Sequence, residues 1–178
     1  MTATLDEAVL TRARAIRLLT CDVDGVLTDG TIYVGGDGQE YKAFSVLDGV
    51  GLKRMVEIDV TVAWLSGSKA PAIAHRARAL GVERVILGVE DKLPSWEALR
   101  AELGLDEAQC AHIGDDLPDI PLLARCGFAA TVPHAPHEVK SIAHFVTTRE
   151  GGAGAVREIC DLLLEARGRP SRYAISGA

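Results

Sequence analysis

Aromatic residues and long hydrophobic runs are both scarce in this chain of 178 residues. Phenylalanine, tryptophan and tyrosine make up 4% of it, whereas 48% of its residues are hydrophobic, so its core must be mainly aliphatic. No apolar run reaches the length that crosses a bilayer, and residues 1–17 are too polar and charged for a secretory signal. The length suits one domain with a sizeable core, and we expect residues 1–178 to form a single domain.

Positive charge is scarce as well. Lysine and arginine total 19 against 25 aspartates and glutamates, which gives a net charge of −6. Nucleic acid and anionic membranes are therefore poor partners, although a phosphate ester can still bind where a metal and a lysine set the local field. The four cysteines have neither disulfide-framework nor metal-ligand spacing, so we expect buried, reduced thiols in a cytoplasmic protein. They are Cys21, Cys110, Cys126 and Cys160.

The most informative segment is IRLLTCDVDGVLTDG, residues 16–30. Its apolar first half predicts a buried strand of a parallel sheet, which delivers Asp22 and Asp24 before the chain breaks at Gly25. The carboxyl end of such a strand is where open α/β sheets bind ligands. Two carboxylates so close repel each other unless a cation or a shared proton relieves them. A hard oxygen site of this kind favours magnesium.

Three further apolar runs also end in polar side chains. Ser66 follows the run 60–65, Lys92 follows a weaker run from residue 84, and CAHIGDD ends in Asp115 and Asp116. Spacings of 44, 26 and 23 residues suit successive strand–helix units, and right-handed crossovers put all four strand ends on one sheet edge. Carboxylates, a hydroxyl and an ammonium gathered there indicate phosphoryl transfer.

These motifs carry a family resemblance. DVDGVLTDG, Ser66-Gly67, Lys92 and GDDLPD, in this order, resemble the four motifs of the haloacid dehalogenase-like phosphohydrolases. With KAF, the DGVG of residues 48–51 and GGAGAVREICDLLL, the chain resembles more closely one branch across residues 16–167. That branch comprises phosphoric monoester hydrolases that act on 3-deoxy-D-manno-octulosonate 8-phosphate in lipopolysaccharide precursor synthesis. The resemblance implies Mg²⁺ as cofactor and a cytoplasmic homotetramer built around hairpins.

The resemblance also implies roles for the acidic residues. Asp22 would attack phosphorus and form an aspartyl-phosphate, and Asp24 would act as general acid and base. The chemistry agrees, because Asp22 ends the rigid strand while Asp24, past it, can reach the leaving oxygen. The expected metal ligands are Asp22, Asp24 and Asp115. Asp116 is expected to orient these ligands without binding the metal ion itself.

The remaining expected site residues bind phosphate or substrate. We expect Ser66, Gly67 and Lys92 to contact the phosphate. Asp119 either supports the site or interacts with the dipole of a helix start. For the rest of the substrate we expect contacts from Thr28, Asp29 and Asp48.

Three departures bear on the substrate. Leu47, Ser68 and Ala153 stand where phosphatases of this branch often carry arginine, so bidentate partners for a carboxylate or phosphate are missing. A phosphatase of a related nine-carbon keto sugar acid phosphate therefore stays open as an alternative. A phospho-receiver domain is disfavoured because its phosphorylated aspartate lies mid-chain, and the intact acidic residues disfavour a catalytically silent relative.

The pattern as a whole predicts a three-layer, Rossmann-like α/β fold with a parallel sheet. Residues 31–44 read as a projecting β-hairpin around Gly35-Gly36-Asp37-Gly38, too small to be a cap domain. Expected helices cover residues 48–57, 69–80, 93–103, 118–126 and 156–166, after a helical lead-in over 1–15. His134 and His137 are expected in a surface loop because of Pro133 and Pro136. The glycines of 151–154 suggest a phosphate nest, and residues 168–178 are expected to be flexible.

Overall fold

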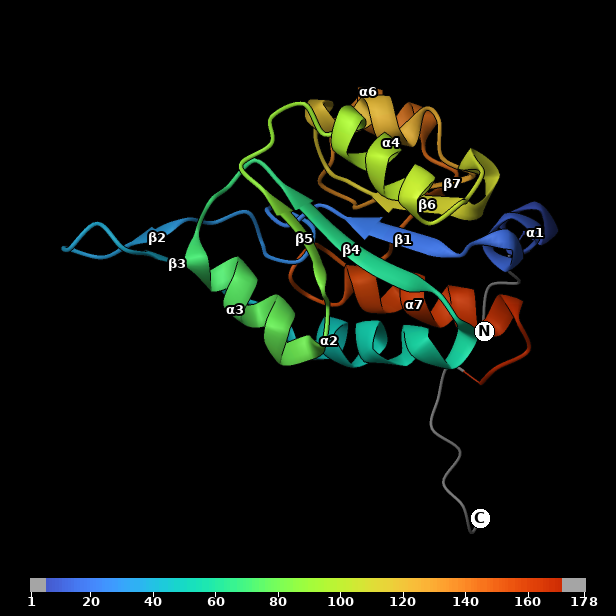
Figure 1. Cartoon of the computed structure of the whole chain (residues 1–178), viewed down its shortest axis with the longest axis horizontal. Coiled ribbons are helices and arrows are strands. Elements are labelled where there is room, and N and C mark those ends of the chain that lie inside the picture. The colour runs from blue at the N-terminus through green and yellow to red at the C-terminus, as the bar shows by residue number, and fades with distance from the viewer. Residues whose placement is uncertain (1–5, 171–178) are drawn as a thin grey trace, which may run out of the picture.

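The computed structural model describes residues 6–170, and a six-stranded parallel sheet forms its centre (Figure 1). The strand order is β5-β4-β1-β6-β7-β8, so the first strand of the sheet lies in the middle and the chain winds outward in both directions. The strands are β1 (Leu18–Cys21), β4 (Thr61–Ser66), β5 (Arg84–Leu87), β6 (Cys110–Ile113), β7 (Phe128–Thr131) and β8 (Phe145–Val146). All four residues of β1 are buried, as expected for a strand covered on both faces.

Helices cover both faces of the sheet (Figure 1). One layer contains α2 (Val46–Lys53), α3 (Pro71–Leu80) and α7 (Ala155–Ala166). The other contains α4 (Leu93–Glu102), α5 (Ile120–Leu123) and α6 (His137–Ile142). The lead-in helix α1 (Glu7–Ala15) packs against α7. This arrangement confirms the predicted three-layer, Rossmann-like α/β fold.

The core is aliphatic, as the composition requires. Val, Leu, Ile and Ala dominate its buried residues, and the few large rings within it include Trp64, Trp96 and Phe128. All four cysteines are buried. Burial raises the pKa of the Cys110 thiol to about 11 and that of Cys126 to about 12, so both are neutral thiols near pH 7. Within residues 6–170, no helix has the length and apolar character needed to span a membrane.

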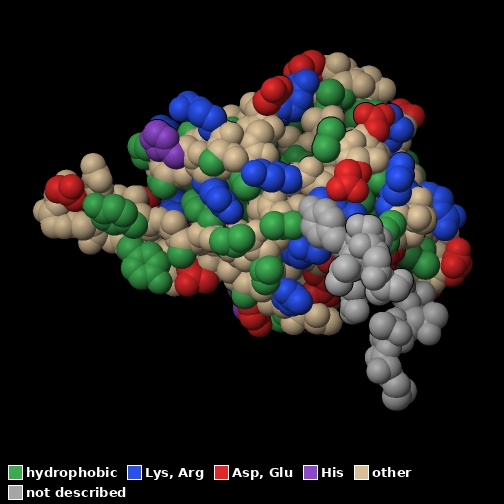
Figure 2. Space-filling view, turned by 90° about the horizontal axis from the view of Figure 1, so that it is seen from below, with side chains coloured by type: hydrophobic (Ala, Val, Ile, Leu, Met, Phe, Trp, Pro, Cys, Tyr) green, Lys and Arg blue, Asp and Glu red, His purple; other side chains and the backbone are tan. Residues whose placement is uncertain are grey.

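The expected hairpin is present after β1. Its strands β2 (Tyr33–Val34) and β3 (Glu40–Tyr41) pair antiparallel and extend away from the sheet (Figure 1). Figure 2 shows hydrophobic side chains gathered on this projection. Ile32, Tyr33, Val34 and Tyr41 are 50–67% exposed, an unusual amount of apolar surface for two such short strands.

Several boundaries differ from the sequence-based prediction. Helix α2 starts at Val46, before Asp48, because the Ser45 side chain caps it by accepting from the Leu47 N–H. It ends at Lys53, and a 3₁₀ helix (Arg54–Ile58) follows. Two shorter 3₁₀ helices lie at Glu107–Gln109 and Leu117–Asp119, the second of them leading into α5.

One further expectation needs correction. His134 lies in a loop as predicted, but His137 begins α6, because Pro136 supplies an extended residue just before the first turn. Residues 168–170 begin the tail that is expected to be flexible, which stays a prediction. Here the Arg169 N–H donates to the Leu164 carbonyl, and Arg54 donates to the Pro170 carbonyl. Residues 171–178, the rest of that expectation, lie outside the described residues.

The glycines before α7 pack against the loop that follows β1. A Cβ placed on Gly151 would lie 1.7 Å from the Gly25 carbonyl oxygen, and the Gly152 N–H donates to the Val26 carbonyl at 3.0 Å. The segment thus supports the loop that carries Asp24. The Gly152 N–H, which was expected to form part of a phosphate nest, is engaged in this contact. Only glycine permits so close an approach of two backbones.

We expect Gly151→Ala to destabilise the protein and to lower its activity more than its stability loss explains. The added methyl group must push the 151–154 segment away from Gly25, at a penalty of about 1–3 kcal/mol. Gly36→Ala is the matched control, because a Cβ there meets nothing within 4 Å. Chemical denaturation and steady-state kinetics on both variants check this; equal stability of the two would contradict it.

Candidate active site

The carboxyl ends of the central strands enclose a cavity of about 470 Å³. Its lining contains most of the residues singled out in the sequence: Asp22, Asp24, Ser66, Gly67, Lys92, Asp115, Asp116 and Asp119. The parallel strands therefore bring four separate motifs to one sheet edge, as their spacing predicted.

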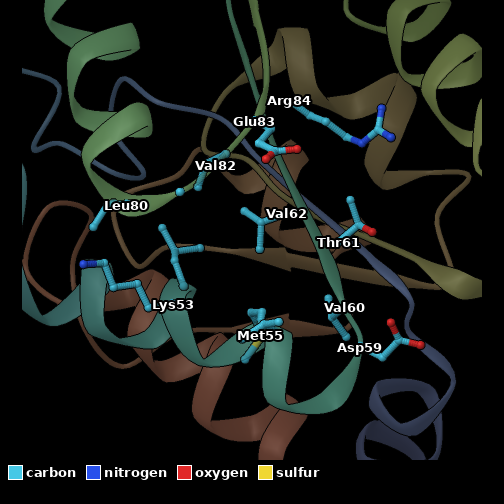
Figure 3. A pocket seen from close by; sticks show the side chains of 13 residues that line it. Lys53, Met55, Asp59, Val60, Thr61, Val62, Leu80, Val82, Glu83 and Arg84 are labelled. Carbon is cyan, nitrogen blue, oxygen red and sulfur yellow. The ribbon is translucent and has the colours of Figure 1, made fainter.

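A second hollow of about 390 Å³ lies at the opposite ends of β4 and β5. Figure 3 shows the side chains around it, among them Lys53, Asp59 and Arg84. Size does not distinguish the two cavities, but chemistry does. Within residues 6–170, one cluster of three side chains could share a metal ion. It consists of Asp22, Asp115 and Asp119, whose ligand atoms lie within 4.8 Å of one another.

Lys92 joins two of these carboxylates. Its Nζ donates to Asp22 Oδ1 at 2.6 Å and to Asp119 Oδ1 at 2.7 Å, and its side chain is 5% exposed. It precedes α4, so strand β5 and this helix together fix its backbone. A lysine in this position differs from an ordinary solvated surface lysine, because both of its partners are themselves buried.

The electrostatics of Asp22 show how crowded the site is. Burial raises the pKa of Asp22 well above its usual range, and the Asp119 carboxylate raises it further, although Lys92 acts in the opposite direction. Burial and the Asp119 carboxylate raise the pKa of Asp115 too. A cation placed among these oxygens would relieve both effects, so the site has the oxygen donors and the unmet charge that a divalent metal needs.

The Asp115 carboxylate lies directly over the turn after β1. A Cβ on Gly25 would be 2.0 Å from Asp115 Oδ2, and Gly25 has a φ of +88°, so glycine is required there on both counts. The Asp115 N–H donates to Asp119 Oδ2 at 3.1 Å. This contact holds the loop after β6 in a fixed conformation, with the Asp115 carboxylate against Gly25.

Asp24 points away from the other carboxylates. Its Oδ1 accepts from Lys42 Nζ at 2.5 Å, and its Oδ2 lies 3.5 Å from Ser66 Oγ. The break at Gly25 thus redirects Asp24, so that it shares the cavity with Asp22 but not the cluster of possible metal ligands. Ser66 is 1% exposed, and its Oγ also accepts from the Ser68 N–H at 3.0 Å.

Comparison with known proteins agrees with this geometry. Residues 85–159 match the model of the haloacid dehalogenase-like hydrolase family. The 3-deoxy-D-manno-octulosonate 8-phosphate phosphatase of Yersinia pestis is 45% identical over 159 residues, which cover 89% of this chain and 85% of that protein. The chain belongs to the 3-deoxy-D-manno-octulosonate 8-phosphate phosphatase family of haloacid dehalogenase-like hydrolases.

Solved structures of this family have the same fold. The crystal structure of the Yersinia pestis phosphatase superposes with a TM-score of 0.90 at 44% identity, covering 92% of this chain and 88% of that one. A phosphatase from Moraxella catarrhalis, solved with a magnesium ion, a phosphate ion and a 3-deoxy-D-manno-octulosonate (KDO) molecule, has a TM-score of 0.88 at 38% identity. Here 92% of this chain and 93% of that one are covered.

Asp116 and Asp119 have different environments within the GDDLPD motif of residues 114–119. The Asp116 side chain caps the following 3₁₀ helix by accepting from the Leu117 N–H at 2.8 Å. Asp119 is 1% exposed and accepts from Lys92, His112 and two backbone N–H groups. Of the two, Asp119 is therefore integrated in the site, and Asp116 is a helix-start residue at its rim.

The three residues expected to contact the substrate lie elsewhere. Thr28 is buried and its hydroxyl closes the loop after β1, donating to the Val23 carbonyl and accepting from the Gly30 N–H. Asp29 accepts from the Thr31 N–H. Asp48 is 2% exposed and accepts from the Arg157 N–H at 2.7 Å, at the start of α7. In the isolated chain all three stabilise local structure, and none lines the cavity.

Sequence reasoning missed three basic side chains beside the site. Lys42 belongs to the KAF motif, but nothing in its spacing revealed the contact with Asp24. His112 belongs to none of the motifs, and its Nε2 lies 3.0 Å from Asp119 Oδ1. His134, expected to be a surface residue, lies 3.5 Å from Asp115 Oδ2 and 2.9 Å from Glu150 Oε2. Each of these contacts joins residues from different segments of the chain.

Proposed function

We propose that this protein hydrolyses 3-deoxy-D-manno-octulosonate 8-phosphate to the free sugar acid and phosphate. The observation that carries the proposal is the buried Asp22–Lys92 pair inside a cluster of three carboxylates at the carboxyl edge of the sheet. A nucleophile, an ammonium and oxygen ligands for a metal at one point suit phosphoryl transfer. Family members at 42–45% identity across about nine-tenths of the chain carry this activity in their names.

In the proposed reaction Asp22 attacks phosphorus and the bond to the sugar oxygen breaks. Asp24 gives its proton to that leaving oxygen. Asp24 then takes a proton from water as the water attacks the aspartyl-phosphate, which releases phosphate and restores Asp22. Ser66, the Gly67 backbone and Lys92 would hold the phosphate oxygens, since they line the same cavity. Lys92 already stands 2.6 Å from the attacking carboxylate.

The residues present fit a magnesium ion. Asp22 and Asp115 would hold it, with Asp119 within reach of the same position. Bound there, Mg²⁺ would neutralise charge on the phosphate and on the crowded carboxylates. The Asp24 side chain faces Lys42, so its proposed part in metal binding requires either its main-chain oxygen or a turn of the side chain.

The substrate assignment has one rival that a specific observation favours. Leu47, Ser68 and Ala153 are neutral where phosphatases of this branch often carry arginine, and Ser68 lines the cavity itself. A phosphatase of a nine-carbon keto sugar acid phosphate therefore remains the second candidate. The eight-carbon substrate is preferred because relatives that are 42–45% identical to this chain are named as phosphatases of that compound.

We further propose that the protein works in the cytoplasm, in lipopolysaccharide precursor synthesis, as a homotetramer assembled through its hairpins. The support is the exposed apolar surface of Ile32, Tyr33, Val34 and Tyr41. The short strands β2 and β3 pair only with each other, which leaves edges that a second chain can cover. Neighbouring hairpins would also shield a cavity that this chain alone leaves open to water.

We expect Asp22→Asn to abolish turnover while the fold is kept. An amide cannot form the acyl-phosphate, whereas its size matches the carboxylate. Asp37→Asn, in the hairpin turn, is the control for the change of charge. Phosphate release and circular dichroism check the pair, and activity near that of the wild type in Asp22→Asn would remove Asp22 from the nucleophile role.

Turnover should need a divalent ion, with Mg²⁺ sufficient. Asp115→Ala should raise the half-saturating Mg²⁺ concentration at least tenfold, because a charged ligand is lost. Asp116→Ala is the matched control: its carboxylate is occupied with the Leu117 N–H, so its magnesium titration should change far less. Full activity after exhaustive chelation would show that the reaction needs no metal ion. An unchanged magnesium titration in Asp115→Ala would show that the metal ion binds elsewhere.

Replacing residues 33–41 by a two-residue turn should give monomers of low activity. The deletion removes Tyr33, Val34 and Tyr41 from the exposed apolar surface but keeps Lys42. Light scattering measures the mass, and Gly36→Ala controls for a change within the hairpin. An oligomer of unchanged mass would exclude the hairpin as the assembly element.

Steady-state kinetics on the eight- and nine-carbon phosphates test the substrate. We expect preference for the eight-carbon compound, with a KM raised about tenfold relative to an arginine-bearing relative, since one charge-assisted hydrogen bond contributes roughly 1.5–3 kcal/mol. Ser68→Arg should then lower KM more than it changes kcat, because the contact is to a part of the substrate that does not react. Clear preference for the nine-carbon compound would promote the second candidate.

A further inference from the structure

A line of buried polar groups runs beneath the candidate nucleophile. Thr20 on β1 and His112 on β6 are register partners in neighbouring strands, and both are 0% exposed. Thr20 Oγ1 lies 2.9 Å from His112 Nδ1 and 3.0 Å from the Ala111 carbonyl oxygen. A hydroxyl and an imidazole in the centre of an aliphatic sheet carry a desolvation penalty unless their hydrogen bonds are made.

The line continues from the imidazole to Asp119. His112 Nε2 lies 3.0 Å from Asp119 Oδ1. Burial alone would raise the pKa of Asp119, but the hydrogen bond and charge of His112, together with Lys92, outweigh it and lower that pKa to about 2. Both Asp119 oxygens already accept from donors, namely Lys92 Nζ and two main-chain N–H groups, so the carboxylate is an acceptor here and Nε2 donates to it. This holds whether or not Nδ1 is protonated as well.

Asp119 in turn is fixed on all sides. Its Oδ2 accepts from the N–H groups of Asp115 and Asp116, while Oδ1 is shared between His112 Nε2 and Lys92 Nζ. Lys92 Nζ has its other contact at Asp22 Oδ1. The position of Oδ1 therefore decides where the ammonium stands relative to the attacking oxygen. Among residues 6–170, His112 contacts this atom from within the sheet, and Thr20 in turn contacts His112.

We propose that His112, oriented by Thr20, is a positioning residue that holds Asp119 so that Lys92 stands against Asp22 and the phosphate. His112 contacts neither the cavity nor the reacting atoms, so its effect passes through Asp119. The inference rests on the proposed phosphatase activity. A role in packing alone would predict that any buried side chain of similar volume serves equally well.

Two substitutions separate these roles. In His112→Gln the terminal amide nitrogen can take the place of Nε2 and donate to Asp119, whereas His112→Leu fills the space without a donor. We expect His112→Leu to lower kcat on p-nitrophenyl phosphate by about 10- to 100-fold, the loss of a hydrogen bond to a charged group. His112→Gln should recover most of this loss. Thr20→Val should lower kcat by less than His112→Leu, and Thr20→Ser should stay near the wild type.

Epistasis with Asp119 supplies a second readout. If His112 acts through this carboxylate, His112→Leu should have little further effect on kcat in an Asp119→Asn background. Melting temperatures recorded for every variant separate lost stability from lost positioning. Equal losses in the Gln and Leu variants that follow the melting temperature would overturn the proposal, and so would full activity of His112→Leu.

Calorimetry can measure how inorganic phosphate binds in the presence of magnesium. This measurement tests the positioning role of His112 independently of whether the protein hydrolyses a phosphate ester. A wild-type protein that releases no phosphate from any ester would refute the proposed function alone. The calorimetry would still test Lys92: phosphate should bind about tenfold more weakly to His112→Leu and near normally to His112→Gln. Unchanged binding in His112→Leu would refute the positioning role whatever the outcome of the activity assays.

Discussion

The ion pairs of Lys92 with Asp22 and Asp119 are the interaction on which the site depends. Three carboxylates from two loops meet within a few ångströms in a buried setting, and an arrangement of this kind is unstable without positive charge. Asp22 and Asp119 more than offset the effect of burial and raise the pKa of Lys92, so this residue stays charged. The pKa of Asp22 is nevertheless raised. One ammonium therefore does not satisfy the cluster, which is the physical reason for a magnesium ion.

Much of the fold maintains this crowding. Strand β1 lies between β4 and β6, and just past its end the Asp22 N–H donates to the Ile113 carbonyl at 2.9 Å. Gly25 leaves room for the Asp115 carboxylate, and Gly151 lets the segment before α7 press on the same turn. Asp48, whose expected role was substrate contact, stabilises the start of α7 from within the protein. Residues distant in sequence thus prevent the loop after β1 from relaxing away from the repulsion.

Sequence reasoning located Asp22, Ser66, Lys92 and Asp115 because each follows an apolar run, and parallel topology sends every such end to one edge. It did not find the partners of Lys42, His112 and His134, because contacts between side chains of different elements leave no local pattern. The helix at His137 was missed because two prolines read as a loop, although a proline just before a first turn favours a helix start. The residues at the strand ends were therefore predictable, whereas the contacts between side chains of different elements were not.

Lys42 connects the hairpin with the candidate active site. It directly follows β3, its side chain is 1% exposed, and its Nζ contacts Asp24, the candidate acid and base. The hairpin therefore carries solvent-exposed apolar side chains on β2 and β3. The residue that follows β3 places a buried ammonium group beside Asp24. A hairpin held by neighbouring chains would fix β3 and with it the position of Lys42. Because Asp24 also faces Ser66, a displaced Lys42 would leave this carboxylate with a single weak contact at 3.5 Å. The orientation of Asp24 is thus a property of the hairpin as much as of the strand that precedes it.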